Sequence, residues 1–337
     1  MTRQDREKQR ILVTGASGFL GHHLVTRLLE EGYQVRVLVR NGSQRTFPWG
    51  QAVEMVEGDV LDPLILQEAL QQIDWVIHTA ARVSFWKQEA REVMAVNVTG
   101  TANVVDACLV AGCRMIQISS IAALGTATGE NMVTETTEWG PGQSRSVYSE
   151  SKRKAELEVF RGIAEGLYAI FINPSIILGP THDWQQGTGK MFSIVNRGLR
   201  VVNPGASGFV GVKDVAAATV FLMDQKVASG EHFLLSAENL SFQEVFSMIA
   251  DQLNKAAPAW ILPRWPTMLV AFLSEWWSWL SGNAPIVTRE SMRSGFLSRT
   301  FDGSRIGGLG FEYTPIQDVI REAATQFRED VQQGRSN

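Results

Sequence analysis

Ile11-Leu12-Val13-Thr14-Gly15-Ala16-Ser17-Gly18-Phe19-Leu20-Gly21 is the stretch that decides the fold of this chain. An apolar, strand-like run leads into a glycine-rich turn, and a helix-like segment follows as far as Glu31. This order of strand, turn and helix N-terminus is typical of folds that bind the pyrophosphate of a dinucleotide. Gly15 suits a tight turn, Gly18 leaves room for the pyrophosphate, and Gly21 lets the helix pack closely on the strand. The helix N-terminus supplies N–H groups and partial positive charge for the anion.

Short apolar runs alternate with segments of helical period through the first 180 residues. The strand-like runs are 11–14, 34–39, 53–56, 74–79, 114–119 and 168–173, and the helix-like segments lie near 20–31, 62–71, 90–111 and 148–165. Such alternation predicts parallel βαβ units with both faces of the sheet covered by helices. We therefore predict an α/β fold built on a Rossmann, doubly wound parallel sheet.

The pattern changes after Gly179-Pro180, which suggests a second unit. We divide the chain into a charged N-terminal segment at 1–10, a dinucleotide-binding Rossmann domain at 11–180 and a smaller, mostly helical substrate-binding lobe at 181–337. Within the lobe we expect helices near 213–225, 241–254 and 315–331 and one or two strands, including one near 231–235. The strand and helix near 205–235 are expected to return to the main sheet.

The composition is that of a globular protein, with 45% hydrophobic and 20% charged residues among 337. A net charge of −4 provides no electrostatic footprint for nucleic acid, so a nucleic-acid partner is disfavoured. The first ten residues, MTRQDREKQR, are charged and lead into only a short apolar run, which does not match a signal peptide. We expect a cytoplasmic protein.

Neither the cysteines nor the histidines suggest a metal site. Cys108 and Cys113 lie five apart, a spacing that fits neither a CxxC redox pair nor a metal-ligand pattern, and we expect buried, inert thiols. Only His22 and His23 are adjacent among the five histidines, and neighbours on a helix point in different directions. We predict no bound metal.

The residue after the second predicted strand indicates the cofactor. Dinucleotide folds that prefer NAD place an acidic side chain there, about 20 residues after the glycine turn, to bind the ribose hydroxyl. This chain has Arg40, whose guanidinium suits a 2′-phosphate, so we expect NADP(H) to be preferred, with Ser43 and Arg45 as helpers. NAD(H) is the alternative if Arg40 is an ordinary solvated residue at a strand end.

Two further strand ends are predicted to meet the cofactor. Asp59 and Val60 close the third strand, where the Asp59 carboxylate could accept from the adenine amino group. The fourth strand ends in small residues, Ala80 and Ala81, which would let a cofactor pass close to the backbone.

Tyr148 and Lys152 are one helical turn apart on one face of a predicted helix. A phenol with a pKa near 10 is a poor acid–base group at neutral pH, and a nearby ammonium group lowers that pKa. Ser120, at the end of the fifth strand, could donate to the same substrate oxygen, and Ser119 is the weaker candidate. Such a pair alone is more often a solvated helix face, but its combination with the glycine turn points to catalysis.

The chain resembles the extended short-chain dehydrogenase/reductases, the NAD-dependent epimerase/dehydratase family. The resemblance covers about half of the chain and rests on TGASGFLG at 14–21, GDV at 58–60, DWVIHTAA at 74–81, VNVTGTANVVDAC at 96–108, ISS at 118–120, YSESK at 148–152 and INPSIILGP at 172–180. Arg40 and the NPSIILGP run place it nearest to the dihydroflavonol reductase-like and 3β-hydroxysteroid dehydrogenase-like members.

The resemblance implies an oxidoreductase and the role of each site residue. Ser120, Tyr148 and Lys152 would form the catalytic triad, with Asn97 organising a helix and a proton-relay water. Hydride would pass between the nicotinamide and a carbonyl or carbinol carbon, while Tyr148 exchanges the proton of the oxygen. The pyrophosphate side would be contacted by Gly15, Ser17, Gly18, Phe19 and Leu20, and the nicotinamide side by Pro174 and Ser175.

The residues after Ser120 bear on the reaction. Dehydratases of this family place an acidic pair there, whereas this chain has Ile121-Ala122-Ala123-Leu124, so dehydration is disfavoured. A nucleotide-sugar epimerase is the alternative, with cations for the sugar nucleotide at Lys190, Arg197 and Arg200, although Arg197 and Arg200 could equally be solvated surface residues. A second alternative is a non-catalytic NADP-binding sensor, although such relatives usually lose the tyrosine or lysine.

A tryptophan-rich segment at 260–280 is the main clue to the substrate. It could be a core helix, a lid over an apolar cleft, or a surface for peripheral contact with a membrane or partner. The uncharged run between Pro266 and Glu275 is too short to span a bilayer. The lid interpretation favours a reductase of an apolar or aromatic carbonyl compound. The tryptophans are Trp260, Trp265, Trp276, Trp277 and Trp279.

Family members commonly pair through two helices, which correspond here to 90–111 and 148–165. By this analogy we expect a homodimer.

Overall fold

A computed structural model of the chain describes residues 3–40, 48–84, 86–126, 132–140, 146–263, 267, 272, 274, 292 and 295–334. Two predictions fall partly outside this range. Ser43 and Arg45 lie outside the described residues, as do Trp265, Trp276, Trp277 and Trp279 of the tryptophan-rich segment. Trp260 is described and is 70% exposed.

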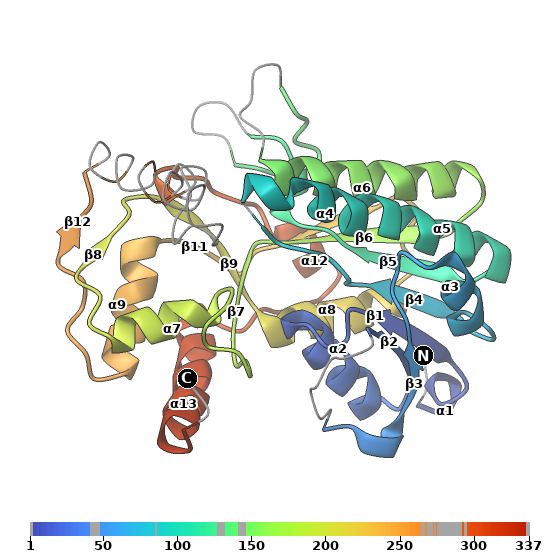
Figure 1. Cartoon of the computed structure of the whole chain (residues 1–337), viewed down its shortest axis with the longest axis horizontal. Helices are drawn as coiled ribbons and strands as arrows, with labels where there is room; N and C mark the ends of the chain where they lie inside the picture. Colours follow the sequence, from blue (N-terminus) through green and yellow to red (C-terminus); the bar gives the residue numbers. More distant parts are fainter. Residues whose placement is uncertain are drawn as a thin grey trace.

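A seven-stranded parallel sheet forms the larger half of the molecule, on the right in Figure 1. Its order is β10-β6-β5-β4-β1-β2-β3, so the direction of chain winding reverses between β1 and β4. The α/β, doubly wound fold class is therefore confirmed. The strands are β1 (Arg10–Thr14), β2 (Gln34–Val39), β3 (Val53–Glu57), β4 (Trp75–His78), β5 (Arg114–Ile118), β6 (Ala169–Pro174) and β10 (His232–Leu235).

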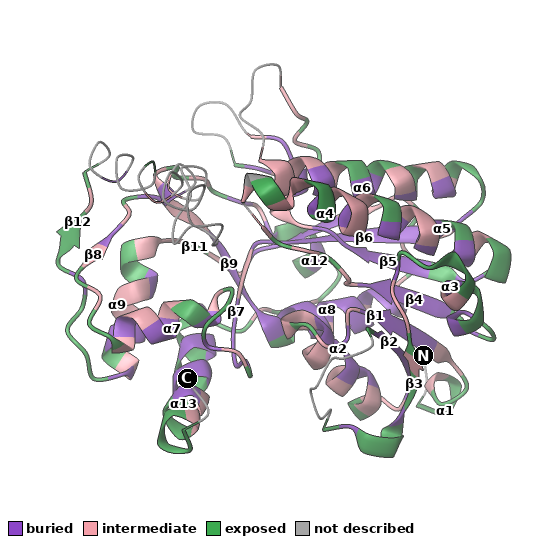
Figure 2. Ribbon diagram, viewed as in Figure 1, coloured by how far each residue is buried: buried purple, intermediate pink, exposed green. Residues whose placement is uncertain are grey.

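Helices cover both faces of this sheet (Figure 1). One face carries α2 (Phe19–Glu30) and α8 (Val212–Met223), and the other carries α3 (Pro63–Ala69), α5 (Gly100–Ala111) and α6 (Val147–Ala164). Successive residues of a strand point to opposite faces. Accordingly Ile11 and Val13 of β1 pack in the core under α2 and α8, whereas Leu12 packs in the core on the other side. Figure 2 shows the strands buried between the two helical layers.

The helix predicted at 90–111 is interrupted. It consists of α4 (Ala90–Met94), a π-helical turn η3 (Ala95–Thr99) and α5. Among the described residues this is the one stretch that is long and apolar enough to pass as a membrane span, by length and composition only. Val104, Val105 and Cys108 pack into the core against the sheet, as in the core helix of a globular domain.

The remaining elements form the lobe on the left in Figure 1, built around α7 (Gly189–Asn196), α9 (Phe242–Gln252) and α13 (Ile316–Gln332). Their apolar faces share one core, which includes Trp184, Phe209 and Phe327. The lobe also holds two small sheets, β11-β9-β7 and β12-β8, where one or two strands were expected. These strands are β7 (Ile176–Leu178), β8 (Val201–Val202), β9 (Ala206–Gly211), β11 (Glu238–Ser241) and β12 (Trp260–Ile261).

The segment 205–235 is shared between the two halves. Its strand β9 belongs to the lobe, whereas α8 covers the main sheet and β10 pairs with β6 at the edge of that sheet. Short elements complete the chain: α1 (Arg3–Arg6), α12 (Ser304–Gly307), and the single turns η1 (Gly50–Ala52), η2 (Lys87–Glu89) and η4 (Ile121–Ala123).

Candidate active site

The glycine turn lies at the point where the sheet reverses its winding, between the carboxyl ends of β1 and β4. Gly15 has φ +71°, and a Cβ there would lie 2.7 Å from the backbone nitrogen of Ala80. A Cβ on Gly21 would lie 2.1 Å from the carbonyl oxygen of Gly15, so α2 packs directly on the turn. Glycine is therefore required at both positions, by backbone conformation and by close approach.

The first turn of α2 is open to an anion. Gly18 is its N-cap and provides no side-chain hydrogen bond to the helix, so Phe19 and Leu20 begin a helix without a side-chain cap. A Cβ on Gly18 would meet only the Gly15 carbonyl oxygen, at 3.2 Å. Uncapped N–H groups and the helix dipole attract an anion, and the turn that includes Ser17 fits a dinucleotide pyrophosphate.

Arg40 directly follows β2, the strand beside β1, and its side chain is exposed. The other arginine of this strand is structural, because buried Arg36 pairs with Glu54 at 2.8 Å and donates to the carbonyl oxygens of Ala69 and Gln71. Arg40 is thus at the carboxyl edge of the sheet, where the ribose of a dinucleotide would lie.

The residues predicted at the next strand ends occupy the same edge. Asp59 follows β3, is half-buried, and accepts a 2.9 Å hydrogen bond from the Leu61 backbone through its carboxylate. Val60 is buried under α5. Ala80 and Ala81 follow β4, and the Ala80 backbone nitrogen donates to the hydroxyl of Thr14 in β1. All four positions lie at the carboxyl edge of the sheet, where the glycine turn also lies.

Ser119 and Ser120 follow β5, and their hydroxyl groups have different partners. The Ser119 hydroxyl donates to the buried carboxylate of Glu156 at 2.6 Å. The Ser120 hydroxyl is hydrogen-bonded to Tyr148 and accepts from the backbone nitrogen of Ala122. Of the two serines, Ser120 is therefore the one that meets Tyr148.

The helix α6 carries Tyr148 and Lys152 and begins with a capping box. The Ser146 hydroxyl accepts from the Ser149 backbone at 2.8 Å, and the Ser149 hydroxyl accepts from the Ser146 backbone at 2.9 Å. This reciprocal pair fixes the first turn, in which Tyr148 lies. One turn later the ammonium group of Lys152 donates to the carbonyl oxygen of Ile118 at 2.9 Å.

Burial dominates the electrostatics of this pair. Burial raises the pKa of the Tyr148 phenol, and the hydrogen bond to Ser120 opposes that rise. Burial also lowers the pKa of Lys152 to about 8, and the nearby charge of Glu156 opposes that change. A tyrosine hydroxyl aligned with a serine and a lysine of reduced pKa is suited to proton exchange with a carbonyl or alcohol oxygen.

Asn97 lies in the π-helical turn η3, and its side-chain amide is fully used. Its oxygen accepts from the Arg82 backbone nitrogen at 2.7 Å, and its nitrogen donates to the Arg82 carbonyl at 3.0 Å and to the Ser151 hydroxyl at 2.8 Å. Asn97 thus joins the loop after β4 to α6, beside Lys152.

Sequence reasoning missed a buried polar network between α6 and the sheet. Glu156 is completely buried one turn after Lys152, and its carboxylate accepts from Ser119 and from Asn173 of β6 at 2.8 Å. The side-chain oxygen of Asn173 lies 3.0 Å from Nδ1 of His232 in β10. The signal for Glu156 was present, because four residues separate it from Lys152 on one helix face.

Pro174 and Ser175, predicted near the nicotinamide, lie at the end of β6, next to β5. Both are buried, and the Ser175 backbone nitrogen donates to the carbonyl oxygen of Leu235 in β10. They therefore lie at the end of β6, next to β5, which Ser119 and Ser120 follow.

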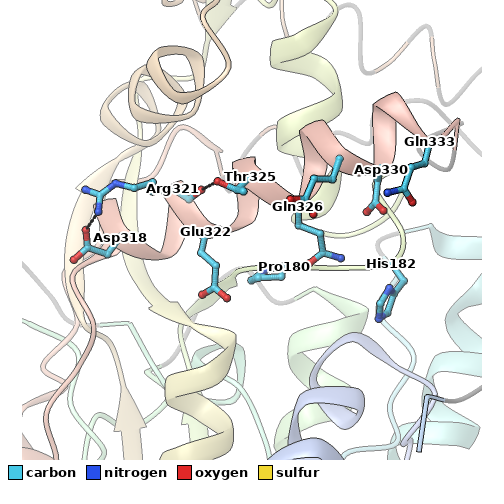
Figure 3. A pocket seen from close by; sticks show the side chains of 10 residues that line it. Pro180, His182, Asp318, Arg321, Glu322, Thr325, Gln326, Asp330 and Gln333 are labelled. Carbon is cyan, nitrogen blue, oxygen red and sulfur yellow. Dashed lines mark hydrogen bonds and ion pairs between the residues drawn. The ribbon is translucent and has the colours of Figure 1, made fainter.

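A groove of about 760 Å³ lies elsewhere, along α13 and beside Pro180 and His182 (Figure 3). Its lining is mostly charged and amide side chains of α13, and it includes none of the residues predicted for the site. Among the described residues, no group of three or more histidine, cysteine, aspartate or glutamate side chains is arranged to hold a metal.

The family model described as the NAD dependent epimerase/dehydratase family matches residues 11–236. The chain belongs to this family. It is an NAD(P)-dependent enzyme of the oxidoreductase type, as expected from the extended short-chain dehydrogenase/reductase motifs. The matched residues include the glycine turn, Ser120, Tyr148 and Lys152.

Similar members of the family include a putative dihydroflavonol 4-reductase of Synechocystis sp., 28% identical over 94% of each chain. Cinnamoyl-CoA reductase 1 of Petunia hybrida is 26% identical over 95% of this chain and 92% of its own. Sterol demethylase protein B of Methylococcus capsulatus is 30% identical over 75% of this chain and 77% of its own.

Two solved structures share the architecture of the chain. The crystal structure of gox2253 is 32% identical, with a TM-score of 0.83 over 98% of this chain and 100% of that one. UDP-glucose 4-epimerase of Thermotoga maritima is 19% identical, with a TM-score of 0.77 over 96% of this chain and 100% of its own. At that identity the likeness to the epimerase shows the fold alone.

Proposed function

We propose that the chain is an NADP(H)-dependent oxidoreductase that reduces the carbonyl group, or oxidises the alcohol, of an apolar or aromatic small molecule. The observation that carries the proposal is the hydrogen bond between Ser120 and Tyr148, with Lys152 one turn further along α6. These groups lie at the sheet edge that also holds the glycine turn.

The chain's own residues account for the proton and the orientation of the substrate. When bound, the nicotinamide would supply or receive the hydride. Tyr148 gives a proton to the carbonyl oxygen or removes it from the alcohol, and Ser120 polarises the same oxygen by donating a hydrogen bond. In this proposal the positive charge of Lys152 stabilises the negative charge that Tyr148 develops as it gives up its proton, and the ammonium group would hold the ribose.

Arg40 supports the preference for NADP(H). It occupies the position where an acidic residue would bind the ribose hydroxyl of NAD, and its exposed guanidinium can pair with a phosphate through several donors. The Asp59 carboxylate, the uncapped start of α2 and the turn with Ser17 provide the rest of the cofactor surface in this proposal.

The surroundings of Ser120 support an apolar substrate. Ile121, the next residue, packs against a buried cluster made by Leu124, Val133, Leu234 and Phe301. The short helix η4 after Ser120 has no acid or base, and two of the similar family members are named as reductases. The cations considered for a sugar nucleotide, Lys190, Arg197 and Arg200, are all exposed, and Arg197 donates to Gln185 on the surface.

The test is NADPH oxidation by the purified protein with a panel of aromatic and alicyclic ketones and aldehydes, beside product analysis with UDP-sugars. We expect carbonyl-dependent oxidation that falls by about 10²-fold or more in Tyr148→Phe. Tyr168→Phe is a matched control, because Tyr168 donates to Val227 away from the site. Conversion of a UDP-sugar to its epimer without carbonyl reduction would support the epimerase, and NADPH binding without turnover would support the sensor.

We also propose a homodimer formed through α5 and α6. Val110 and Leu157 are 78% and 51% exposed on these helices, which pack side by side. Leu157→Glu should convert a dimer to a monomer in sedimentation experiments, because the apolar contact would be lost. A monomer for the parent protein would contradict this proposal.

A further inference from the structure

The turn that holds Ser120 is anchored by buried polar groups from two other elements, Glu156 of α6 and Asn173 of β6. The Ser119 hydroxyl donates to the Glu156 carboxylate at 2.6 Å, and the Asn173 amide nitrogen donates to the Ser120 carbonyl oxygen at 3.1 Å. The same amide nitrogen donates to Glu156 at 2.8 Å. Glu156 and Asn173 therefore act as one unit that binds the side chain of Ser119 and the backbone of Ser120.

We propose that Glu156, together with Asn173, is a positioning residue that aligns the Ser119–Ser120 turn with Tyr148 and keeps Lys152 in its charged form. Neither residue is proposed to touch the substrate or the cofactor. The inference rests on the function proposed above, because it assigns a second layer of groups to that same site. Its two parts, alignment and charge, have separate structural causes and can be tested apart.

The alignment has a simple geometric basis. The two anchors lie on either side of the Ser120 α-carbon, one on the preceding side chain and one on its own carbonyl group. With both ends held, the Ser120 hydroxyl is directed to Tyr148 while it accepts from the Ala122 backbone. Loss of either anchor frees the turn, and small displacements of a catalytic group are costly in rate.

His232 sets the orientation of the Asn173 amide. Its Nδ1 lies 3.0 Å from the Asn173 oxygen, and its ring is stacked on Phe171 with centroids 4.1 Å apart and an interplanar angle of 9°. The Asn173 oxygen can only accept, so Nδ1 of His232 is the donor, and burial lowers the pKa of the ring. The Asn173 nitrogen is thereby left to face Ser120 and Glu156.

The charge effect follows from the burial of Lys152. Its ammonium group has one carbonyl partner, Ile118, and the carboxylate of Glu156 lies one turn along the same helix. Burial lowers the pKa of Lys152 and Glu156 raises it, so removal of that carboxylate should let Lys152 lose its proton at a lower pH.

The other ionisable groups around this pair are few among the described residues. Arg153 of α6 forms an ion pair with Glu156 at 3.2 Å, and His232 of β10 lies 4.0 Å from it. His78 of β4 interacts with Lys152, and its pKa is lowered to about 3 by burial and by that positive charge, so it is neutral at working pH. Tyr148 completes the set on α6. None of these supplies a second negative charge to Lys152 near neutral pH.

The experiment compares Glu156→Gln with Asn173→Ala. Glu156→Gln keeps the volume of the side chain and an acceptor for Ser119 but removes the negative charge. The fall of kcat at high pH should therefore have its midpoint below pH 8, while the KM for NADPH changes little. Asn173→Ala removes the anchor on Ser120 and no charge, so kcat should fall by about ten- to 100-fold with the alkaline limb unmoved.

Asp214→Asn is the matched control for loss of a buried carboxylate. Asp214 is buried on α8 and accepts from the Thr314 backbone and hydroxyl at 3.0 and 2.8 Å, away from the site. We expect this variant to lose thermal stability without a change in the pH profile. If Glu156→Gln behaves in the same way, the carboxylate is only structural and the inference is overturned.

A second readout does not require turnover. NMR titration of isotope-labelled lysine, with Lys152 assigned by its loss in Lys152→Met, measures its pKa directly in the folded protein. The midpoint should be lower in Glu156→Gln than in the parent, and an unchanged midpoint overturns the charge effect. If the parent reduces no carbonyl compound, the proposed function fails while this measurement still decides the electrostatic part. If Tyr148→Phe abolishes activity and Asn173→Ala does not reduce it, only the alignment fails.

Discussion

The ammonium group of Lys152 donates a 2.9 Å hydrogen bond to the carbonyl oxygen of Ile118, the last residue of β5. This contact ties α6 to the strand whose next residues are Ser119 and Ser120. The helix that carries Tyr148 and the strand that leads to Ser120 are therefore joined by a direct hydrogen bond from a side chain of the helix to the backbone of the strand. The position of Tyr148 relative to Ser120 therefore depends on a contact between α6 and β5 and not on the conformation of one loop.

The activity should depend on the protonation of Lys152. Burial lowers its pKa from the ordinary 10.5 to about 8, so the ammonium form is present below about pH 8 and is lost above it. Tyr148 stays protonated across this range because burial raises its pKa. We expect kcat/KM for carbonyl reduction to fall as pH rises through about 8. In Lys152→Met the remaining activity should be low and should not fall as the pH rises through about 8. If the activity of that variant still falls with the same midpoint, the pH dependence belongs to another group.

Gly21→Ala should weaken dinucleotide binding and folding together. The new Cβ would lie 2.1 Å from the Gly15 carbonyl oxygen, which forces α2 away from the turn. Overpacking of this kind costs about 1–3 kcal/mol of folding free energy. Chemical denaturation and fluorescence titration with NADPH would measure both effects. Gly307→Ala is the control, since a Cβ there meets nothing within 4 Å, and equal losses in the two variants would contradict the explanation.

Arg40→Ala should change cofactor preference without a loss of fold. A charge-assisted contact with phosphate is worth about 1.5–3 kcal/mol, so the Kd for NADPH should rise roughly tenfold to 100-fold while that for NADH stays nearly constant. Isothermal titration with both cofactors provides the measurement. Arg321→Ala removes another exposed arginine, which pairs with Asp318 on α13, and should alter neither affinity. Equal weakening of NADPH and NADH binding would exclude the 2′-phosphate as the partner.

Asn97→Asp should destabilise the link between α6 and the loop after β4. The amide nitrogen of Asn97 donates to the Arg82 carbonyl and the Ser151 hydroxyl, and a carboxylate oxygen in its place would lose the donor to the carbonyl. The lost and unsatisfied bonds should cost about 1–3 kcal/mol in the free energy of unfolding, measured by urea denaturation. Asn103→Asp is the comparison on the same helical segment, because the Asn103 side chain donates one hydrogen bond, to the carbonyl oxygen of Val60. A smaller loss for Asn97 than for Asn103 would contradict the role as a link.

The sequence was sufficient to predict the sheet and the glycine turn, because those features are local. Each main strand is four to six residues long and most are dominated by apolar residues, and each glycine role follows from the turn itself. The elements that were not predicted are those with weak local signals. The strands β8 and β12 are two residues long, α7 begins at Gly189, and the π-helical turn η3 has no recognised sequence pattern.

The outer layer of the site could not be predicted for a different reason. Glu156, Asn173 and His232 come from α6, β6 and β10, and only the strand order brings them together. The helical spacing of Lys152 and Glu156 was visible, but nothing in the sequence showed that the carboxylate would be completely buried. Asn173 was part of a recognised motif, yet its direction depends on the neighbouring strand.

The π-helical turn η3 holds one residue more than an α-helical turn would, so the side chains of α5 lie about 100° further around the helix than in an uninterrupted α-helix. Before the turn, Glu92 of α4 faces outward to pair with Arg82. After it, Val104 and Cys108 of α5 face the core. Deletion of one residue here would turn either Glu92 away from Arg82 or Val104 and Cys108 away from the core. The number of residues in this helical segment is therefore constrained as strongly as their chemistry.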